Sequence, residues 1–166
     1  MKKFVLGLGA QRSGTTFLFN LLSQYHESIT PFIKELHIWD ALEIDLCKRW
    51  RIFNPEFLTF QNDKIIKKCV KNNQIDILNK IILVKGFRME LQNNPQKYFE
   101  YFNFLLKSKN KEISFDITPE YIGLKAETLK YINDSFHQND IDCKFIIILR
   151  DPIDRCWSAL KSKFKK

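Results

Sequence analysis

The sequence has few of the residues that interrupt or cross-link a chain. Its 166 residues include only 5 Gly, 5 Pro and 4 Cys. So little glycine and proline excludes a collagen-like chain and a low-complexity linker, because both need these residues in quantity. No apolar run approaches the roughly 18 residues that a membrane-spanning helix requires, so we expect no transmembrane segment. The length and the globular composition predict a single domain over residues 1–166.

The four cysteines form no pattern that predicts a metal site. Cys47, Cys69, Cys143 and Cys156 include no CxxC pair, and no histidine stands at ligand spacing from any of them. Cys69 and Cys143 have apolar neighbours, which favours a role as small core residues. We therefore expect no metal ion, reduced thiols and a cytoplasmic protein.

The charge is unbalanced toward basic residues. Against 27 Lys and Arg there are 19 Asp and Glu, which gives a net charge of +8. Such an excess favours an anionic partner, such as nucleic acid, a phosphorylated cofactor or an acidic polymer. A lysine-rich composition that only keeps the chain in solution explains it equally well. The basic residues are mostly scattered lysines without an arginine-rich stripe, which argues against nucleic acid.

Short apolar segments alternate along the chain with helical patterns. Strands are predicted over residues 4–8, 112–117 and 144–149, with a short one around 29–31. Helices are predicted over residues 14–25 and 124–136, and after the Asx-Pro pairs at 54–55, 94–95 and 151–152. The inner face of the first helix is expected to consist of Phe17, Leu18, Leu21, Leu22 and Tyr25. This alternation predicts an α/β fold, a doubly wound parallel sheet flanked by helices.

In such sheets the ligand lies beyond the carboxyl ends of the strands. Residues 9–16, GAQRSGTT, join the first strand to the first helix, and the backbone N–H groups of such a loop can hold a phosphate. The spacing of Gly9 and Gly14 matches the ATP-binding loop GxxxxGK followed by Ser or Thr. Thr15 stands where that loop has its lysine, and the basic residue is Arg12 instead. This departure argues against an ATP-dependent kinase, whose lysine contacts the β- and γ-phosphates.

The same loop resembles the 5′-phosphosulfate loop of sulfotransferases that use 3′-phosphoadenylyl sulfate (PAPS). Residues 34–40, KELHIWD, resemble a segment of the carbohydrate branch, which includes the heparan sulfate enzymes and their bacterial relatives. Residues 145–158 resemble the family's 3′-phosphate segment, and residues 116–121, DITPEY, are a weaker match. The resemblance covers residues 4–158 and implies an α/β fold of the P-loop-containing, nucleotide-binding type.

The resemblance implies sulfuryl transfer from PAPS, as co-substrate, to a hydroxyl or amine of an acceptor, most simply a carbohydrate. The residues it assigns to PAPS are Gln11, Arg12, Ser13, Gly14, Thr15, Thr16, Arg150 and Ser158. It also assigns Arg12 to charge neutralisation on the bridging oxygen, and Glu35 to the general base. An ion pair of Glu35 with Lys34 or Arg12 is the structural alternative. His37 either orients the acceptor, acts as another base or is structural.

Two departures from the family pattern leave a second hypothesis open. Ile117 stands where the family often has a lysine. Family members also continue for on the order of 100 residues, whereas this sequence ends at Lys166, within the helix that carries Ser158. We therefore expect a C-terminally truncated member. The alternative function is a truncated remnant that binds 3′-phosphoadenosine nucleotides with little or no turnover.

Overall fold

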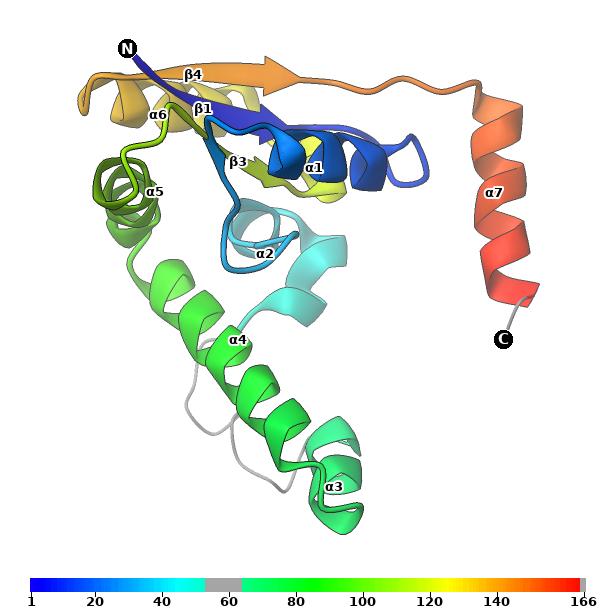
Figure 1. Cartoon of the computed structure of the whole chain (residues 1–166). Helices are drawn as coiled ribbons and strands as arrows, with labels where there is room; N and C mark the ends of the chain where they lie inside the picture. The colour runs from blue at the N-terminus through cyan, green and yellow to red at the C-terminus, as the bar shows by residue number, and fades with distance from the viewer. Residues whose placement is uncertain (53–63, 165–166) are drawn as a thin grey trace.

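The computed structural model describes residues 1–52 and 64–164, and its centre is a four-stranded sheet (Figure 1). The strands are β1 (Lys2–Gly7), β2 (Ser28–Ile29), β3 (Ile113–Ile117) and β4 (Ile141–Ile146). They lie in the order β2-β3-β1-β4, and each pairing is parallel. The predicted parallel α/β sheet is therefore confirmed.

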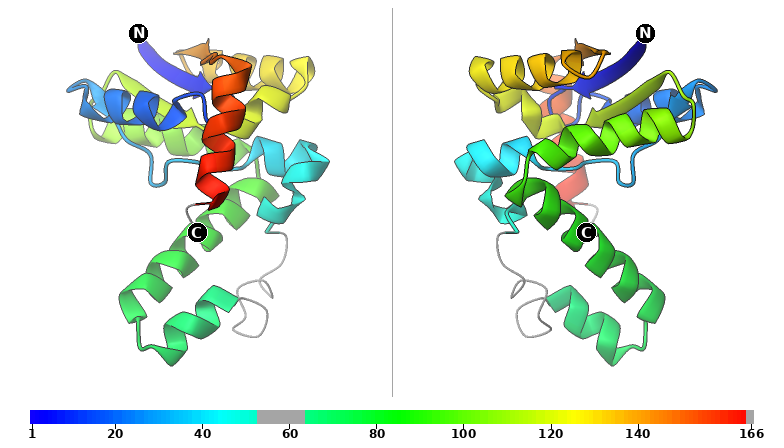
Figure 2. Two further views of the ribbon diagram at one scale, coloured as in Figure 1. Left: turned by 90° about the vertical axis from the view of Figure 1, so that its right-hand side faces the viewer. Right: turned by 90° about the vertical axis from the view of Figure 1, so that its left-hand side faces the viewer.

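Helices pack on both faces of this sheet, as the alternating side chains of β1 require. Phe4 and Leu6 point into the larger core, which α5 (Gln96–Ser108) and α6 (Ala126–His137) complete. Val5 points the other way, into a smaller cluster beneath α1 (Thr15–Gln24). Figure 2 shows α1 and α6 on opposite sides of the sheet.

The remaining elements extend from this central unit. After β2 come α2 (Trp39–Glu43) and the 3-10 helix η1 (Asp45–Trp50). Helix α4 (Ile75–Asn93) runs away from the sheet, with α3 (Lys64–Lys71) at its far end (Figures 1 and 2). A second 3-10 helix, η3 (Pro119–Gly123), follows β3. Helix α7 (Pro152–Phe164) stands apart from the sheet and has no buried residue. None of the helices in the described part of the chain is both long and apolar enough to cross a bilayer.

The prediction for the last strand was wrong in its position. It was expected over residues 144–149, but β4 covers Ile141–Ile146. The pairing with β1 explains the difference, because Lys2 to Gly7 pair one to one with Ile141 to Ile146 and β1 ends at Gly7. Leu149 lies beyond the sheet and is 84% exposed, although it is strongly apolar.

The predicted inner face of α1 was also partly wrong. Leu18 and Leu22 do pack on the sheet, but Phe17, Leu21 and Tyr25 are exposed. Phe19 takes their place, with its ring 5.4 Å from that of Phe115. The side of α1 that faces the sheet is set by the small apolar cluster on this sheet face. The helical repeat of apolar residues in the sequence does not show where that cluster lies.

Only one of the three predicted Asx caps is seen. In α7, Asp151 Oδ1 accepts hydrogen bonds from the backbone N–H groups of Ile153 and Asp154, at 2.9 and 3.1 Å. In α5 the N-cap is Pro95, without a side-chain cap, so the prediction for Asn94 was wrong. The predicted cap at Asn54 lies outside the described residues. Cys69 and Cys143 are buried, as expected.

Candidate functional site

Loops from the carboxyl ends of the strands meet around a cavity of about 460 Å³. The residues that line it are Gln11, Arg12, Gly14, Thr15, Thr16, Lys34, Glu35, Pro119, Arg150 and Ser158. The cavity thus brings together all of the predicted site residues except Ser13 and His37, which are buried next to it.

The loop between β1 and α1 has the backbone of an anion site. Arg12 and Gly14 have φ angles of 66° and 102°, and such left-handed residues turn successive N–H groups into one concavity. Glycine is also required at position 9, because a Cβ there would lie 2.8 Å from Thr15 Cγ2. Helix α1 begins at this loop with no acidic residue in its first turn and no side-chain cap on Gly14. Its first N–H groups can therefore bind an anion.

The charges around the cavity favour the same kind of ligand. Arg12, Lys34 and Arg150 supply three positive charges, against one carboxylate from Glu35. Arg150 Nη1 also donates a hydrogen bond to the Arg12 carbonyl oxygen at 3.2 Å, which links the segment after β4 to the loop after β1. Ser13 is buried, and its Oγ has no hydrogen-bond partner among the described residues. A buried hydroxyl without a partner is costly, and an oxygen of a bound phosphate would supply one.

Glu35 is held as a carboxylate at the edge of the cavity. Lys34 Nζ lies 2.6 Å from Glu35 Oε1, and His37 Nε2 lies 3.6 Å from Oε2. The interaction with His37 is the largest cause that lowers the pKa of Glu35 to about 2; Lys34 adds to it, and burial opposes it. Glu35 is therefore ionised at neutral pH. The predicted ion pair with Lys34 is confirmed, and the same carboxylate also faces the cavity.

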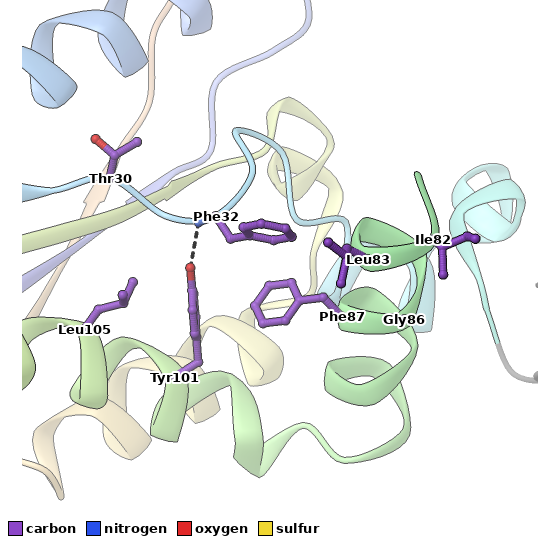
Figure 3. A pocket seen from close by; sticks show the side chains of 8 residues that line it. All are labelled: Thr30, Phe32, Ile82, Leu83, Gly86, Phe87, Tyr101 and Leu105. Atoms are coloured by element: carbon purple, nitrogen blue, oxygen red, sulfur yellow. Dashed lines mark hydrogen bonds between the residues drawn. The ribbon is translucent and has the colours of Figure 1, made fainter. Parts of the chain in front are cut away.

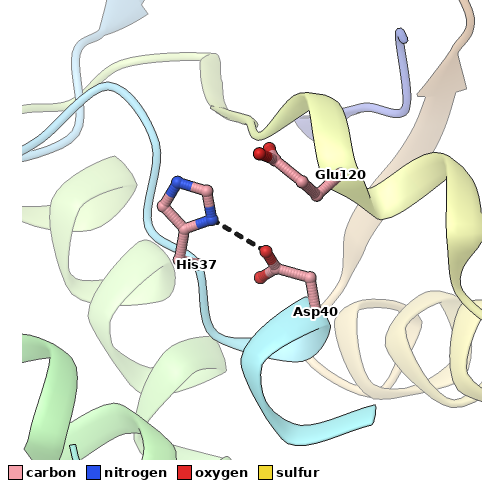
Figure 4. Close-up of side chains that lie close together, drawn as sticks. All are labelled: His37, Asp40 and Glu120. Atoms are coloured by element: carbon pink, nitrogen blue, oxygen red, sulfur yellow. Dashed lines mark hydrogen bonds and ion pairs between the residues drawn. The ribbon is translucent and has the colours of Figure 1, made fainter. Parts of the chain in front are cut away.

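His37 lies behind Glu35 and does not line the cavity. Its side chain is 1% exposed and stacks on Trp50, with ring centroids 4.0 Å apart. On the other side, Nδ1 lies 2.8 Å from Asp40 Oδ2 (Figure 4). Burial lowers the pKa of His37, but the hydrogen bonds to Asp40 and Glu35 outweigh it and raise that pKa to about 8. His37 is thus an imidazolium that links two carboxylates.

His37, Asp40 and Glu120 also resemble a metal-ligand set by distance alone. One ligand atom from each lies within 4.8 Å of the others. His37 also contacts Glu35, since its Nδ1 lies 2.8 Å from Asp40 and its Nε2 lies 3.6 Å from Glu35. Asp40, His37 and Glu35 thus form a line of alternating charges, with a hydrogen bond between the first two and an ion pair between the last two.

The backbone around Glu35 is held from one side by helix α4. Arg88 Nη2 donates to the carbonyl oxygen of Glu35 at 2.7 Å, and Arg88 Nε donates to that of Leu36 at 3.0 Å. One turn further along, Gln92 Nε2 donates to the carbonyl oxygen of His37 at 2.8 Å. The two α4 side chains thus fix three consecutive carbonyl groups.

The segment after β3 holds the same backbone from the other side. Thr118 Oγ1 accepts from the Leu36 N–H at 3.1 Å, and the Tyr121 hydroxyl accepts from the Ile38 N–H at 3.2 Å. Both hydroxyls donate in turn to Asp116, at 2.8 and 2.9 Å. Asp116 is 0% exposed, and burial raises its pKa to about 6 against the opposing effect of these hydrogen bonds.

Sequence reasoning missed most of this support. It treated residues 116–121 as a weak match and gave no role to Arg88 or Gln92. The signals that were present are small. Arg88 and Gln92 are four residues apart, which places them on one face of a helix, and Asp116 and Thr118 alternate at the end of a strand.

A family model described as "Sulfotransferase family" matches residues 4–166. A search of curated proteins found no match. The family match spans the anion loop, the Glu35 segment and the residues that follow β4, which are the parts that build the cavity. The chain therefore belongs to the sulfotransferase family.

Proposed function

We propose that this chain transfers a sulfuryl group from PAPS to a hydroxyl or amine of a carbohydrate acceptor. One observation supports the proposal: the anion loop, Arg150, Ser158 and Glu35 all line a single cavity. The carbohydrate class rests on the resemblance of residues 34–40 to that branch of the family. Sulfuryl transfer needs both an anion site for the donor and a proton acceptor for the nucleophile.

The residues of the cavity fit a nucleotide with phosphates at both ends. The loop N–H groups, Ser13 Oγ and the hydroxyls of Thr15 and Thr16 would hold the 5′ phosphate, with Gln11 beside them. Arg150 and Ser158 would hold the 3′ phosphate through charge-assisted hydrogen bonds. Bound PAPS would supply the sulfuryl group, with the 3′,5′-diphosphate as the leaving group.

Arg12 neutralises the negative charge that develops on the leaving oxygen. Arg12 belongs to the anion loop, where its backbone is left-handed, and it lines the cavity. A fixed cation next to developing charge stabilises a transition state more than a ground state. Arg12 is therefore a catalytic residue in this proposal.

Glu35 takes the proton that the acceptor's hydroxyl or amine loses. With a pKa of about 2, held there first by His37 and then by Lys34, it is a weak base. Lys34 lines the same cavity, so an anionic donor group there would draw its ammonium away from Glu35. Loss of that ion pair removes the smaller of the two interactions that lower the pKa of Glu35, so this pKa rises while the interaction with His37 remains. His37 keeps the carboxylate in place and is a positioning residue.

One observation favours the second candidate, a nucleotide-binding protein with little turnover. The low pKa of Glu35 describes a carboxylate that is well stabilised and poorly basic. In that case 3′-phosphoadenosine 5′-phosphate would bind, and transfer to any acceptor would be slow or absent.

Transfer of label from PAPS to a panel of glycans tests the proposal, with wild type and Glu35→Gln compared. The substitution keeps the shape and removes the proton acceptor. We expect transfer by the wild type, a loss of at least about 100-fold in Glu35→Gln, and equal nucleotide affinity by calorimetry. Nucleotide binding by the wild type without transfer to any glycan would favour the second candidate. Undiminished transfer by Glu35→Gln would show that Glu35 is not the base.

We also propose a cytoplasmic location. Supporting it, the four cysteines are free thiols, three of them buried. Burial raises the pKa of the thiols of Cys47 and Cys143 to about 11 and about 12. Such thiols are protected from oxidation, so the support for this location is the free state of the cysteines as a whole.

A further inference from the structure

A second cavity, of about 720 Å³, lies between α4, α5 and the segment after β2 (Figure 3). The residues that line this apolar groove are Thr30, Phe32, Ile82, Leu83, Gly86, Phe87, Tyr101 and Leu105. Among them, only Thr30 and Tyr101 have polar side-chain atoms. The Tyr101 hydroxyl oxygen accepts a hydrogen bond from the Phe32 N–H at 2.6 Å. The volume is typical of small-molecule sites, whereas the lining has little with which to bind a polar ligand.

Gly86 indicates that the groove is open for a reason other than packing. It lies in the middle of the 19-residue helix α4, where glycine costs about 1 kcal/mol relative to alanine. A Cβ at this position would meet no atom within 4 Å. The glycine therefore relieves no crowding within the protein. Its effect is to leave helix backbone exposed to the groove, where a ligand can approach closely.

The groove and the proposed active site are separate cavities that two elements connect. Phe32 lines the groove and Lys34 lines the site cavity, so their Cα atoms are at most about 7 Å apart along the chain. On α4, Gly86 lines the groove, and Arg88 holds the backbone of Glu35 and Leu36. A molecule in the groove would thus lie next to the segment that carries Glu35, and a sugar attached to it would extend toward the site cavity.

We propose that the groove binds the alkyl or acyl chain of the acceptor, whose sugar then reaches Glu35. The acceptor is accordingly a carbohydrate joined to a lipid chain, and this inference rests on the proposed function. The arrangement of the aromatic side chains favours an alkyl chain as the ligand over a planar ring. Phe32 with Phe87, and Phe87 with Tyr101, meet edge to face at 5.5 and 4.8 Å, so they form one wall and no parallel pair that would enclose a ring. Ile82, Leu83 and Leu105 complete an aliphatic surface.

Binding of methyl and octyl glucoside, measured by calorimetry without PAPS and below micelle formation, tests the groove directly. Each methylene that is buried contributes about fourfold in affinity, so we expect octyl glucoside to bind at least tenfold more tightly. Gly86→Leu fills the groove and should abolish this preference. Gly86→Ala adds a single methyl group at the same position and should reduce the preference for octyl glucoside less than Gly86→Leu does. The affinity for 3′-phosphoadenosine 5′-phosphate shows that each variant is folded.

Equal binding of the two glucosides by the wild type would overturn the inference, as would a chain preference that survives Gly86→Leu. Self-association that Gly86→Leu abolishes, with no chain preference, would identify the groove as a contact between copies and would also overturn it. The proposed function is tested separately. A chain preference without transfer from PAPS to any acceptor would leave the groove assigned and the proposed function wrong. Transfer from PAPS without a preference for octyl glucoside would support the proposed function and show that the inference about the groove is wrong.

Discussion

Arg12 and His37 both have a left-handed backbone conformation, with φ angles of 66° and 54°. Both residues belong to segments that build the cavity. A side chain in this conformation costs about 1 kcal/mol or more. Contacts elsewhere must offset that cost, and here they are the anion loop and the hydrogen bonds around Glu35. Two of the five described non-glycine residues with positive φ belong to the proposed site, and the other three, Asn73, Asn110 and Asp140, lie elsewhere.

Replacement of Arg12 by alanine should remove transfer and preserve the fold. The side chain is exposed at the cavity and is not part of the core, so the free energy of unfolding should change little. Loss of the charge contact should lower the transfer rate by about 100-fold or more. Arg12→Lys, which keeps a cation at the position, should retain more activity than Arg12→Ala. Wild-type transfer by a stable Arg12→Ala protein would contradict the role of Arg12.

His37 should make stability depend on pH in a defined window. Its pKa rises from 6.5 to about 8 on folding, so the folded state binds the proton more tightly. The resulting stabilisation is complete below pH 6.5 and is lost as the pH rises through about 8. We expect the free energy of unfolding, measured by urea denaturation, to fall by about 1.5 kcal/mol between about pH 6.5 and about pH 8.5.

His37→Gln provides the control for this measurement. Glutamine does not titrate, so the variant should be less stable at neutral pH and nearly independent of pH over the same window. Asp116, whose pKa burial raises to about 6, changes its charge mainly below the window. The same pH slope in wild type and His37→Gln would show that another group causes it.

At the scale of elements, the segment Glu35–Ile38 is fixed by two others, α4 and the turn that follows β3. Arg88 and Gln92 bind its carbonyl groups, and Thr118 and Tyr121 bind its N–H groups. A base held in this way loses little entropy when the acceptor binds. The position of Glu35 therefore depends on tertiary contacts and little on its own sequence neighbours.

Arg88→Met should separate catalysis from nucleotide binding. Methionine keeps much of the packing on Trp50 but removes both hydrogen bonds to the Glu35 segment. We expect kcat to fall about tenfold or more, with nucleotide affinity within twofold of wild type. Arg51→Met is the matched control, because Arg51 also donates to two carbonyl groups, those of Ala41 and Leu42. An equal loss of kcat in both variants would show a general effect on stability.

How much the sequence could predict depends on whether a feature lies within one element or requires contact between several. The loop at residues 9–16 is local, because a strand, a turn and a helix follow each other directly, and its anion-binding backbone was predicted. Arg150 and Ser158, which the resemblance assigned to the 3′ phosphate, also line the cavity, because β4 is adjacent to β1 and ends on the same edge of the sheet. The end of β4 was missed because it depends on where β1 ends, at Gly7.

The role of α4 is the clearest case in which sequence reasoning was insufficient. No element was predicted over residues 75–93, because their apolar residues occur on all sides of the helix without a single stripe. Its contacts with the Glu35 segment join residues more than 50 positions apart. Only the packing of the whole chain brings Arg88 and Gln92 to that segment.

At the scale of the whole molecule, the proposal depends on joining two distant parts of the chain. The loop after β1 supplies the 5′-phosphate site, and the segment from β4 into α7 supplies Arg150 and Ser158. The hydrogen bond from Arg150 to the Arg12 carbonyl oxygen joins the two. Because α7 has no buried residue, its position relies on such surface contacts. We therefore expect nucleotide affinity to be modest and to fall as salt rises.

Calorimetry with 3′-phosphoadenosine 5′-phosphate and with 5′-AMP tests this central claim most directly, because the two ligands differ only in the 3′ phosphate. We expect the first to bind at least tenfold more tightly, and Arg150→Ala to bring the two affinities close together. Arg155→Ala is the matched control: Arg155 lies on α7 but is not among the residues that line the cavity, so the preference should persist. Equal affinity of the wild type for both nucleotides would contradict the account, since Arg150 and Ser158 would then not form a 3′-phosphate site.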